Sequence, residues 1–167
     1  MELFIESKDI QIRVKQLATD ISQDHMASGN ELPPVMICIL NGAYMFYTDL
    51  LRNMKINVQS DFIRLKSYTG RDNSEGIETI KGLEIDLKGR NVYIVDDICD
   101  TGTTILETLF MVNSHLPKQV KVVTLTRRGG GVDLTDFCGF VIGDEWIAGY
   151  GLDNNGVGRN LEDLYKV

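Results

Sequence analysis

The fold of this chain is decided by one stretch of its sequence, Asn91-Val92-Tyr93-Ile94-Val95-Asp96-Asp97-Ile98-Cys99-Asp100-Thr101-Gly102-Thr103-Thr104. An apolar run typical of a buried strand ends at two adjacent aspartates, a third aspartate follows, and a Thr-Gly-Thr-Thr turn begins a helix. The turn offers free N–H groups, hydroxyls and the positive end of a helix dipole, which favour an anion. The carboxylates beside it therefore need another partner: vicinal hydroxyls, a magnesium ion or a developing cation. A phosphorylated sugar supplies a phosphate for the turn and a diol for the acid pair.

Strands and helices alternate on either side of this stretch. The expected helices are one capped by Ser7 and ended by residues 29–34, a short one that runs to Arg52 after Asn41-Gly42-Ala43, and one over residues 103–116. The expected strands are Val35–Leu40, 61–68, the run ending at Asp96, 120–125 and Phe137–Ile142. This order predicts an α/β fold in a single domain over residues 1–167, with a mostly parallel central sheet flanked by helices. Ligands of such sheets bind beyond the carboxyl ends of the strands, where Asn41, Asp96 and Arg128 are expected.

Composition and net charge exclude several classes of protein. Hydrophobic residues make up 43% and charged residues 25% of the chain, which is typical of a globular domain. The net charge of −7 argues against a broad nucleic-acid surface. No apolar run has membrane-spanning length, and the acidic first residues are unlike a signal peptide. Cys38, Cys99 and Cys138 are odd in number and lack zinc-site spacing, so we expect free thiols in a reducing cytosol.

Two common nucleotide-binding motifs are missing from the sequence. It contains no G-x-x-x-x-G-K-[ST] motif, so Asp96 and Asp97 have no P-loop partner that would make them part of a nucleotidase. No G-x-G-x-x-G follows a strand and opens a helix, which leaves a dinucleotide fold unsupported. The alternative that the two aspartates merely end a strand is weakened by the third carboxylate and the phosphate-type turn.

The run from Val95 to Thr104 resembles the phosphoribosyl-diphosphate (PRPP) signature of type I phosphoribosyltransferases. Three more segments resemble the hypoxanthine-guanine branch of that family in the same order, Leu40-Asn41-Gly42, Asp61-Phe62-Ile63-Arg64-Leu65-Lys66-Ser67-Tyr68 and Gly149-Tyr150-Gly151-Leu152-Asp153. The resemblance covers most of the chain between Pro34 and Leu161. It implies the type I phosphoribosyltransferase fold, with a small hood on the purine side.

The resemblance also implies roles on the ribose phosphate side. Asp96 and Asp97 would hold the ribose 2′- and 3′-hydroxyls, with Asp96 in a place where glutamate is usual. Asp100 would lie close to purine N7 and act as the catalytic base. The 5′-phosphate would bind the loop formed by Asp100, Thr101, Gly102, Thr103 and Thr104.

On the other side of the ribose, the resemblance implies three purine-binding residues, Arg128, Trp146 and Ile147. Trp146 would stack on the base, although a lone tryptophan is more often a packing residue. Arg128 stands where a lysine usually donates to purine O6, and arginine presents its donors differently. Magnesium would bind Asp153, and pyrophosphate would bind Asn41, Gly42 and Arg159, with Asn41 where lysine is frequent. A lid that includes Ser67 and Tyr68 would exclude water, although residues 69–76 also fit an ordinary hairpin connection.

The implied activity is purine salvage by Mg²⁺-dependent transfer of the phosphoribosyl group from PRPP to hypoxanthine or guanine, which gives IMP or GMP and pyrophosphate. The resemblance further implies a cytoplasmic homodimer or homotetramer without nucleic-acid or membrane partners. Two alternatives stay open: an enzyme of the same type that prefers xanthine, and a regulator that senses PRPP or nucleotide on the same fold.

Overall fold

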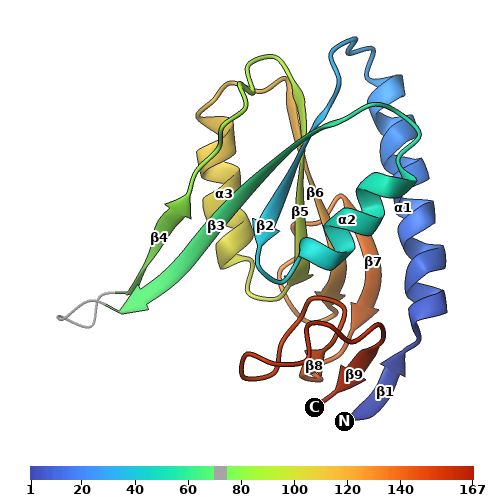
Figure 1. Cartoon of the computed structure of the whole chain (residues 1–167). Coiled ribbons are helices and arrows are strands. Elements are labelled where there is room, and N and C mark those ends of the chain that lie inside the picture. The colour runs from blue at the N-terminus through green and yellow to red at the C-terminus, as the bar shows by residue number, and fades with distance from the viewer. Residues whose placement is uncertain (70–74) are drawn as a thin grey trace.

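Six strands form the central sheet of the computed structural model, which describes the backbone of residues 1–69 and 75–167 and the side chains of residues 1–65 and 79–167. The strands lie in the order β4-β3-β2-β5-β6-β7 (Figure 1). All neighbours are parallel except β3 and β4, which pair antiparallel at one edge. The strand bounds are β2 Val35–Leu40, β3 Gln59–Thr69, β4 Glu75–Lys81, β5 Asn91–Cys99, β6 Gln119–Arg128 and β7 Phe137–Ile142. The predicted mostly parallel α/β sheet is thereby confirmed.

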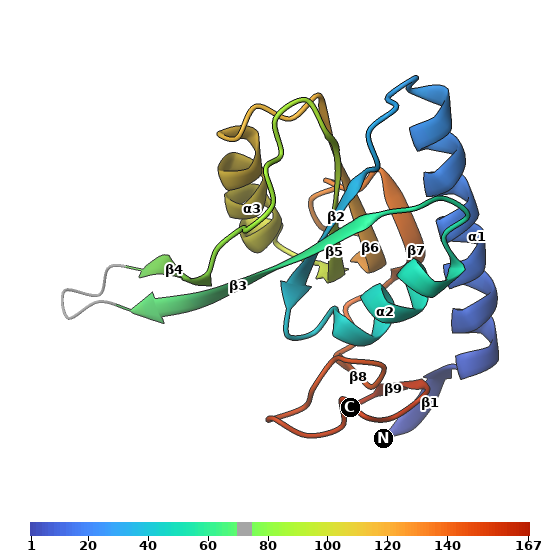
Figure 2. The same cartoon turned by 45° about the horizontal axis from the view of Figure 1, so that its top comes forward.

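Helices cover both faces of this sheet. Helices α1 (Ser7–Ala27) and α2 (Tyr44–Asn53) lie on one face, and α3 (Thr103–Asn113) lies on the other (Figure 2). The helical spacing of Ile10, Val14 and Leu17 turns one side of α1 toward the core, where these side chains are buried with Phe46 of α2. The described helices include none that is long and apolar enough to span a membrane.

A second, three-stranded sheet joins the two ends of the chain. Its order is β1-β9-β8, with β1 at Glu2–Ile5, β8 at Ile147–Ala148 and β9 at Leu164–Lys166. Figure 1 shows it beyond the carboxyl ends of the central strands, with both termini nearby. This is the position expected for the hood. Its strands β1 and β9 were not predicted, because they are short and pair residues far apart in the sequence.

The start of α1 corrects one prediction. Ser7 was expected to cap the helix, but it is the first helical residue, Glu6 precedes the helix, and no side chain of Glu6 caps it. Instead, the backbone N–H of Ser7 donates to the Asp163 carboxylate at 2.7 Å. A carboxylate at this position also favours the positive end of the helix dipole. The cap therefore comes from the hood, 156 residues away.

Several element boundaries also differ from the predictions. Helix α3 ends at Asn113 rather than at residue 116, and β6 runs on to Arg128 rather than ending at residue 125. Of the segment expected to be a loop, residues 69–76, Thr69 lies in β3 and Glu75 and Gly76 lie in β4, and residues 70–74 are outside the described residues. The hairpin alternative fits this backbone. Ser67 and Tyr68 lie in β3, but their side chains are outside the described part of the chain.

Candidate active site

The topology of the sheet creates a crevice between β2 and β5. After β2 the chain passes through α2 and adds β3 on one side, whereas after β5 it passes through α3 and adds β6 on the other. At such a reversal of strand order, the connections diverge and leave room for a ligand beyond the carboxyl ends of the strands. Gly42 follows β2 at this edge, and the last residues of β5 include Asp96 and Asp97.

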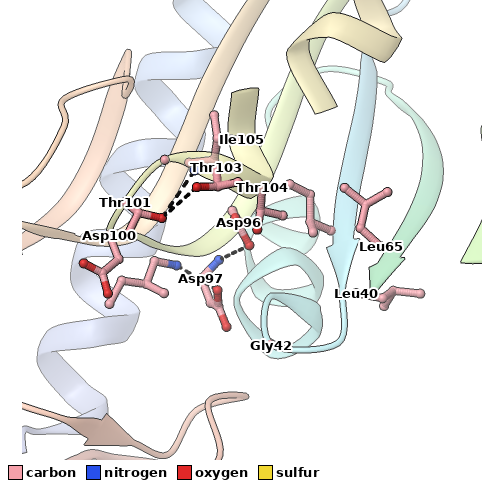
Figure 3. Close-up of a pocket in the computed structure, with 13 residues that line it drawn as sticks. Leu40, Gly42, Leu65, Asp96, Asp97, Asp100, Thr101, Thr103, Thr104 and Ile105 are labelled. Carbon is pink, nitrogen blue, oxygen red and sulfur yellow. Dashed lines mark hydrogen bonds between the residues drawn. The ribbon is translucent and has the colours of Figure 1, made fainter. Parts of the chain in front are cut away.

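A hollow of about 280 Å³ occupies this crevice (Figure 3). Its wall combines the end of β2, the carboxylates of β5 and the turn that begins α3. The lining residues include Gly42, Asp96, Asp97, Asp100, Thr101, Gly102, Thr103 and Thr104. The structure therefore brings the predicted ribose- and phosphate-binding residues into one site.

The turn before α3 has the geometry of an anion site. Gly102 precedes the helix with φ of +79°, a left-handed conformation that glycine adopts most readily. The first N–H groups of a helix have no partner within it, and Gly102 has no side chain that could accept from them. Only the N–H of Thr103 makes a long hydrogen bond, of 3.5 Å, to the hydroxyl of Thr101 among the described residues. The hydroxyls of Thr101 and Thr103 lie 3.1 Å apart beside them (Figure 3). N–H groups, hydroxyls and the helix dipole here converge on the hollow.

Two carboxylates lie side by side at the end of β5. Asp96 is buried, and its Oδ1 accepts the backbone N–H of Asp97 at 3.0 Å. Burial, followed by the neighbouring charge of Asp97, raises the pKa of Asp96 well above its ordinary value. Burial also raises the pKa of Asp97, while hydrogen bonds and the charge of Arg159 act in the opposite direction. The pair is thus unfavourable as two bare charges and suited to donors such as a diol.

At Gly42, the chain after β2 lies so close to the Asp97 carboxylate and to the backbone of Gly151 that a side chain is excluded. A Cβ at Gly42 would lie 1.5 Å from Oδ2 of Asp97. A Cβ at Gly151, in the loop between β8 and β9, would lie 2.2 Å from the carbonyl oxygen of Gly42. Gly151 had no predicted role, and the Gly149-Tyr150-Gly151 pattern was the only local signal for it. This contact fixes the hood against the crevice.

A second hollow, of about 140 Å³, adjoins the first on the side of the hood. Both hollows are lined by Asp97, Ile98 and Asp100, so one ligand can extend from one to the other. The remaining lining residues of the second hollow are Arg128, Trp146, Ile147, Leu152 and Asp153. Trp146 is 62% exposed, which argues against the packing alternative and leaves its ring accessible. Leu152 had no predicted role and adds an apolar wall.

The guanidinium of Arg128 is held on several sides. Its Nη1 donates to the carbonyl oxygens of Gly143 at 2.8 Å and Glu145 at 3.0 Å. Its Nε lies 3.2 Å from Oδ1 of Asp100. Among the described residues, Nη2 has no hydrogen-bond partner. Nη2 is therefore the guanidinium nitrogen that is available to donate a hydrogen bond to a ligand.

Asp153 and Arg159 form an ion pair at the edge of the second hollow. Arg159 also donates to the carbonyl oxygen of Gly151 at 2.7 Å, and Asp153 accepts the N–H of Gly156 at 2.7 Å. Arg159 is thereby near both Asp153 and the Asp97 carboxylate, although it lines neither hollow. Asn41 is exposed and does not line them either.

The donor set suits a magnesium ion that is shared with a substrate. The described residues contain no cluster of three or more His, Cys, Asp or Glu side chains that would enclose a metal. Mg²⁺ usually keeps several waters and binds through one or two carboxylates together with substrate phosphates. Asp153, half-buried beside the crevice, fits such a role.

Comparison with known proteins shows the family to which the chain belongs. The phosphoribosyl transferase domain family matches residues 6–155, which is most of the chain. The chain therefore belongs to the phosphoribosyltransferase family.

Individual relatives show to which branch of the family the chain belongs. A hypoxanthine-guanine phosphoribosyltransferase of Aquifex aeolicus is 36% identical over 100% of this chain and 94% of its own length. A hypoxanthine-guanine-xanthine phosphoribosyltransferase of Tritrichomonas foetus is 36% identical over 92% of this chain and 84% of its own. The crystal structure of a hypoxanthine-guanine phosphoribosyltransferase from Bacillus anthracis matches with a TM-score of 0.89 and 34% identity, covering 100% of this chain and 98% of that one. The chain is an enzyme of the hypoxanthine-guanine branch.

The buried acid pair predicts a trade-off between ligand binding and stability. Because the pKa of Asp96 in the folded chain lies above the unperturbed value of about 3.9, its ionisation destabilises the fold as the pH rises toward neutrality. Asp96→Asn keeps an acceptor for the N–H of Asp97 but removes this cost. The variant should melt at a higher temperature than the parent at pH 7, and the gain should shrink toward pH 4.

Thermal unfolding followed by circular dichroism across this pH range measures the effect. Asp20→Asn, on the exposed surface of α1, is the matched control and should show neither the gain nor its pH dependence. An Asp96→Asn protein no more stable than the parent at pH 7 would contradict the account of the pair.

Proposed function

We propose that this enzyme transfers the 5-phosphoribosyl group of PRPP to hypoxanthine or guanine with the help of Mg²⁺, and so forms IMP or GMP and pyrophosphate in purine salvage. One observation carries the proposal: two adjoining hollows of different chemistry share Asp97, Ile98 and Asp100. One offers a helix N-terminus that begins at a glycine, and the other an exposed indole beside a guanidinium. A nucleoside monophosphate has the matching phosphate, ribose and base in the same order.

In this proposal the first hollow binds the ribose 5-phosphate. The 5′-phosphate accepts hydrogen bonds from the 100–104 loop, where an anion also meets the positive end of α3. The 2′- and 3′-hydroxyls donate to Asp96 and Asp97, and these hydrogen bonds offset the free-energy cost of burying the two carboxylates. The Gly42 turn, with Asn41 beside it, and Arg159 take the pyrophosphate.

The base occupies the second hollow. Trp146 supplies a large flat surface for stacking, and buried Ile147 supplies backbone hydrogen-bonding groups next to it. Nη2 of Arg128 donates to purine O6. A 6-amino group would instead place donor against donor and leave Nη2 of Arg128 without an acceptor, which disfavours adenine.

The chemical step forms the bond between purine N9 and C1 of the ribose while the bond from C1 to pyrophosphate breaks. The carboxylate of Asp100 accepts the proton from N7, which makes N9 a better nucleophile. Asp96 and Asp97 lie on the ribose side, where positive charge develops at C1. Mg²⁺ held at Asp153 would neutralise charge on the departing pyrophosphate. Arg159 contributes a fixed positive charge to the same group, and closure of a lid that includes Ser67 and Tyr68 excludes water.

Xanthine is a specific alternative base, because the name of the relative from Tritrichomonas foetus includes xanthine. A regulator that senses PRPP is less well supported, because the net charge of −7 disfavours a nucleic-acid target and Asp100 is retained at the site. We further propose that residues 1–167 act as one domain in the cytoplasm, as a homodimer or homotetramer, without nucleic-acid or membrane partners.

Steady-state rates with four bases test the proposed function. With saturating PRPP and Mg²⁺, hypoxanthine and guanine should be converted to their nucleotides with release of pyrophosphate, whereas adenine should react at least about 100-fold more slowly. Xanthine, run in the same series, reports on the alternative. Efficient turnover of adenine, or no turnover of any base, would refute the assignment.

Asp100→Asn should mainly slow the chemical step. The amide keeps the shape of the side chain but cannot accept the N7 proton, and loss of a general base typically lowers the rate by about 10²- to 10⁴-fold. The affinity for PRPP should change little, because the phosphate is held mostly by the N–H groups of the turn. Single-turnover rates together with PRPP titrations separate the two quantities. A turnover number within about threefold of the parent would exclude Asp100 from this role.

A further inference from the structure

Arg128 differs from the other charged residues of the site because its guanidinium is bonded in three directions. Only 11% of its side chain is exposed, and its Nη1 is occupied by the carbonyl oxygens of Gly143 and Glu145. The third bond runs from Nε to Oδ1 of Asp100, at 3.2 Å. A planar guanidinium with these fixed directions allows little freedom to the groups that it joins.

Asp100 is the more exposed partner in this arrangement. Its side chain is 51% exposed, and among the described residues its carboxylate has no other hydrogen-bond or ion-pair partner. An exposed aspartate samples several rotamers unless a neighbour selects one. Here the largely buried arginine selects the rotamer that leaves the carboxylate in the wall of both hollows.

The carbonyl oxygens that accept from Arg128 link the Asp100 rotamer to the stacking surface of Trp146. Gly143 and Glu145 lie in the segment that leads from β7 directly to Trp146. The same guanidinium therefore bonds to the residue just before the indole and to the carboxylate that faces the base. The distance and angle between the base platform and the proton acceptor depend on one rigid group.

We propose that Arg128 is a positioning residue for Asp100: it fixes the carboxylate, relative to the Trp146 platform, where it can accept the N7 proton. This inference rests on the proposed function. It is distinct from the donation of Nη2 to purine O6, since it uses Nε and Nη1. A lysine ammonium at this position cannot hold two carbonyl oxygens and a carboxylate in the directions that a planar fork provides.

The electrostatic attraction between Arg128 and Asp100 contributes little free energy by itself. A pair in which one partner is half exposed is screened by water, and its coupling energy is small. Orientation has a larger effect on rate, because displacement of a catalytic group by about 1 Å can cost about 100-fold. The consequence of losing Arg128 should accordingly appear in kcat and should require the presence of the Asp100 carboxylate.

A double-mutant cycle with Arg128→Lys and Asp100→Asn tests this dependence. Single-turnover rates are measured with hypoxanthine at saturating base, PRPP and Mg²⁺. In the parent, Arg128→Lys should lower the rate by about 10- to 100-fold. In the Asp100→Asn background the same change should alter the rate by less than about twofold, because no proton acceptor remains to be positioned. Equal losses in both backgrounds would overturn the proposal.

Arg13→Lys is the matched control. Arg13 lies on α1, away from the hollows, and its guanidinium likewise donates to two carbonyl oxygens, those of Gly139 at 2.9 Å and Cys138 at 2.7 Å. Arg13→Lys should therefore lower the melting temperature without lowering the single-turnover rate. A rate loss in this variant equal to that of Arg128→Lys would contradict a specific effect on Asp100.

The outcomes separate failure of the inference from failure of the proposed function. If the parent enzyme does not turn over any 6-oxopurine, the proposed function fails; if it does and the cycle is additive, only the inference fails. Where Arg128→Lys does not fold, Arg128→Gln, which keeps an amide donor for one carbonyl, enters the same cycle. Failure of both to fold, with Arg13→Lys folded, would assign Arg128 a purely structural role and would also overturn the proposal.

Discussion

The burial of Asp96 beside Asp97 at the end of β5 is the constraint on which the site depends. A buried carboxylate next to a second one is costly unless donors surround it, and among the described residues the cost is offset by the hydrogen bond between the two carboxyl groups, by backbone N–H groups and by the charge of Arg159. A ligand with paired hydroxyls supplies the missing donors. The strand that carries the pair is held between β2 and β6, which fixes the backbone from which both carboxylates project.

The rest of the fold brings the start of α3, the turn at Gly42 and the hood close to the Asp96–Asp97 pair. The reversal of strand order opens the crevice, the left-handed Gly102 directs the start of α3 into it, and Gly42 allows the neighbouring turn to approach Asp97. The hood closes the far side because Gly151 packs on the carbonyl of Gly42. Gly151 meets the backbone of Gly42, and Gly42 meets the carboxylate of Asp97, so a side chain at either glycine would displace the groups that form the site.

Local sequence patterns predicted most of the sheet and the phosphate side of the site. Val35–Leu40 and Phe137–Ile142 have the predicted bounds, and the Asp96–Thr104 run forms one wall of the first hollow. The hood strands, the cap that Asp163 provides for α1 and the bonds of Arg128 were not predicted. All three join residues that are distant in sequence, so no local periodicity or turn signal reports them. Resemblance to a family indicated a role for Arg128 at O6 but not the geometry of its guanidinium.

The central claim is that the two hollows hold a single nucleotide, and a crystal structure of the enzyme with GMP tests it most directly. The account predicts the 5′-phosphate within hydrogen-bonding distance of the N–H groups of Thr103 and Thr104, the ribose hydroxyls on Asp96 and Asp97, and the guanine ring against Trp146. A phosphate bound away from the start of α3, or a base that does not contact Trp146, would contradict the account.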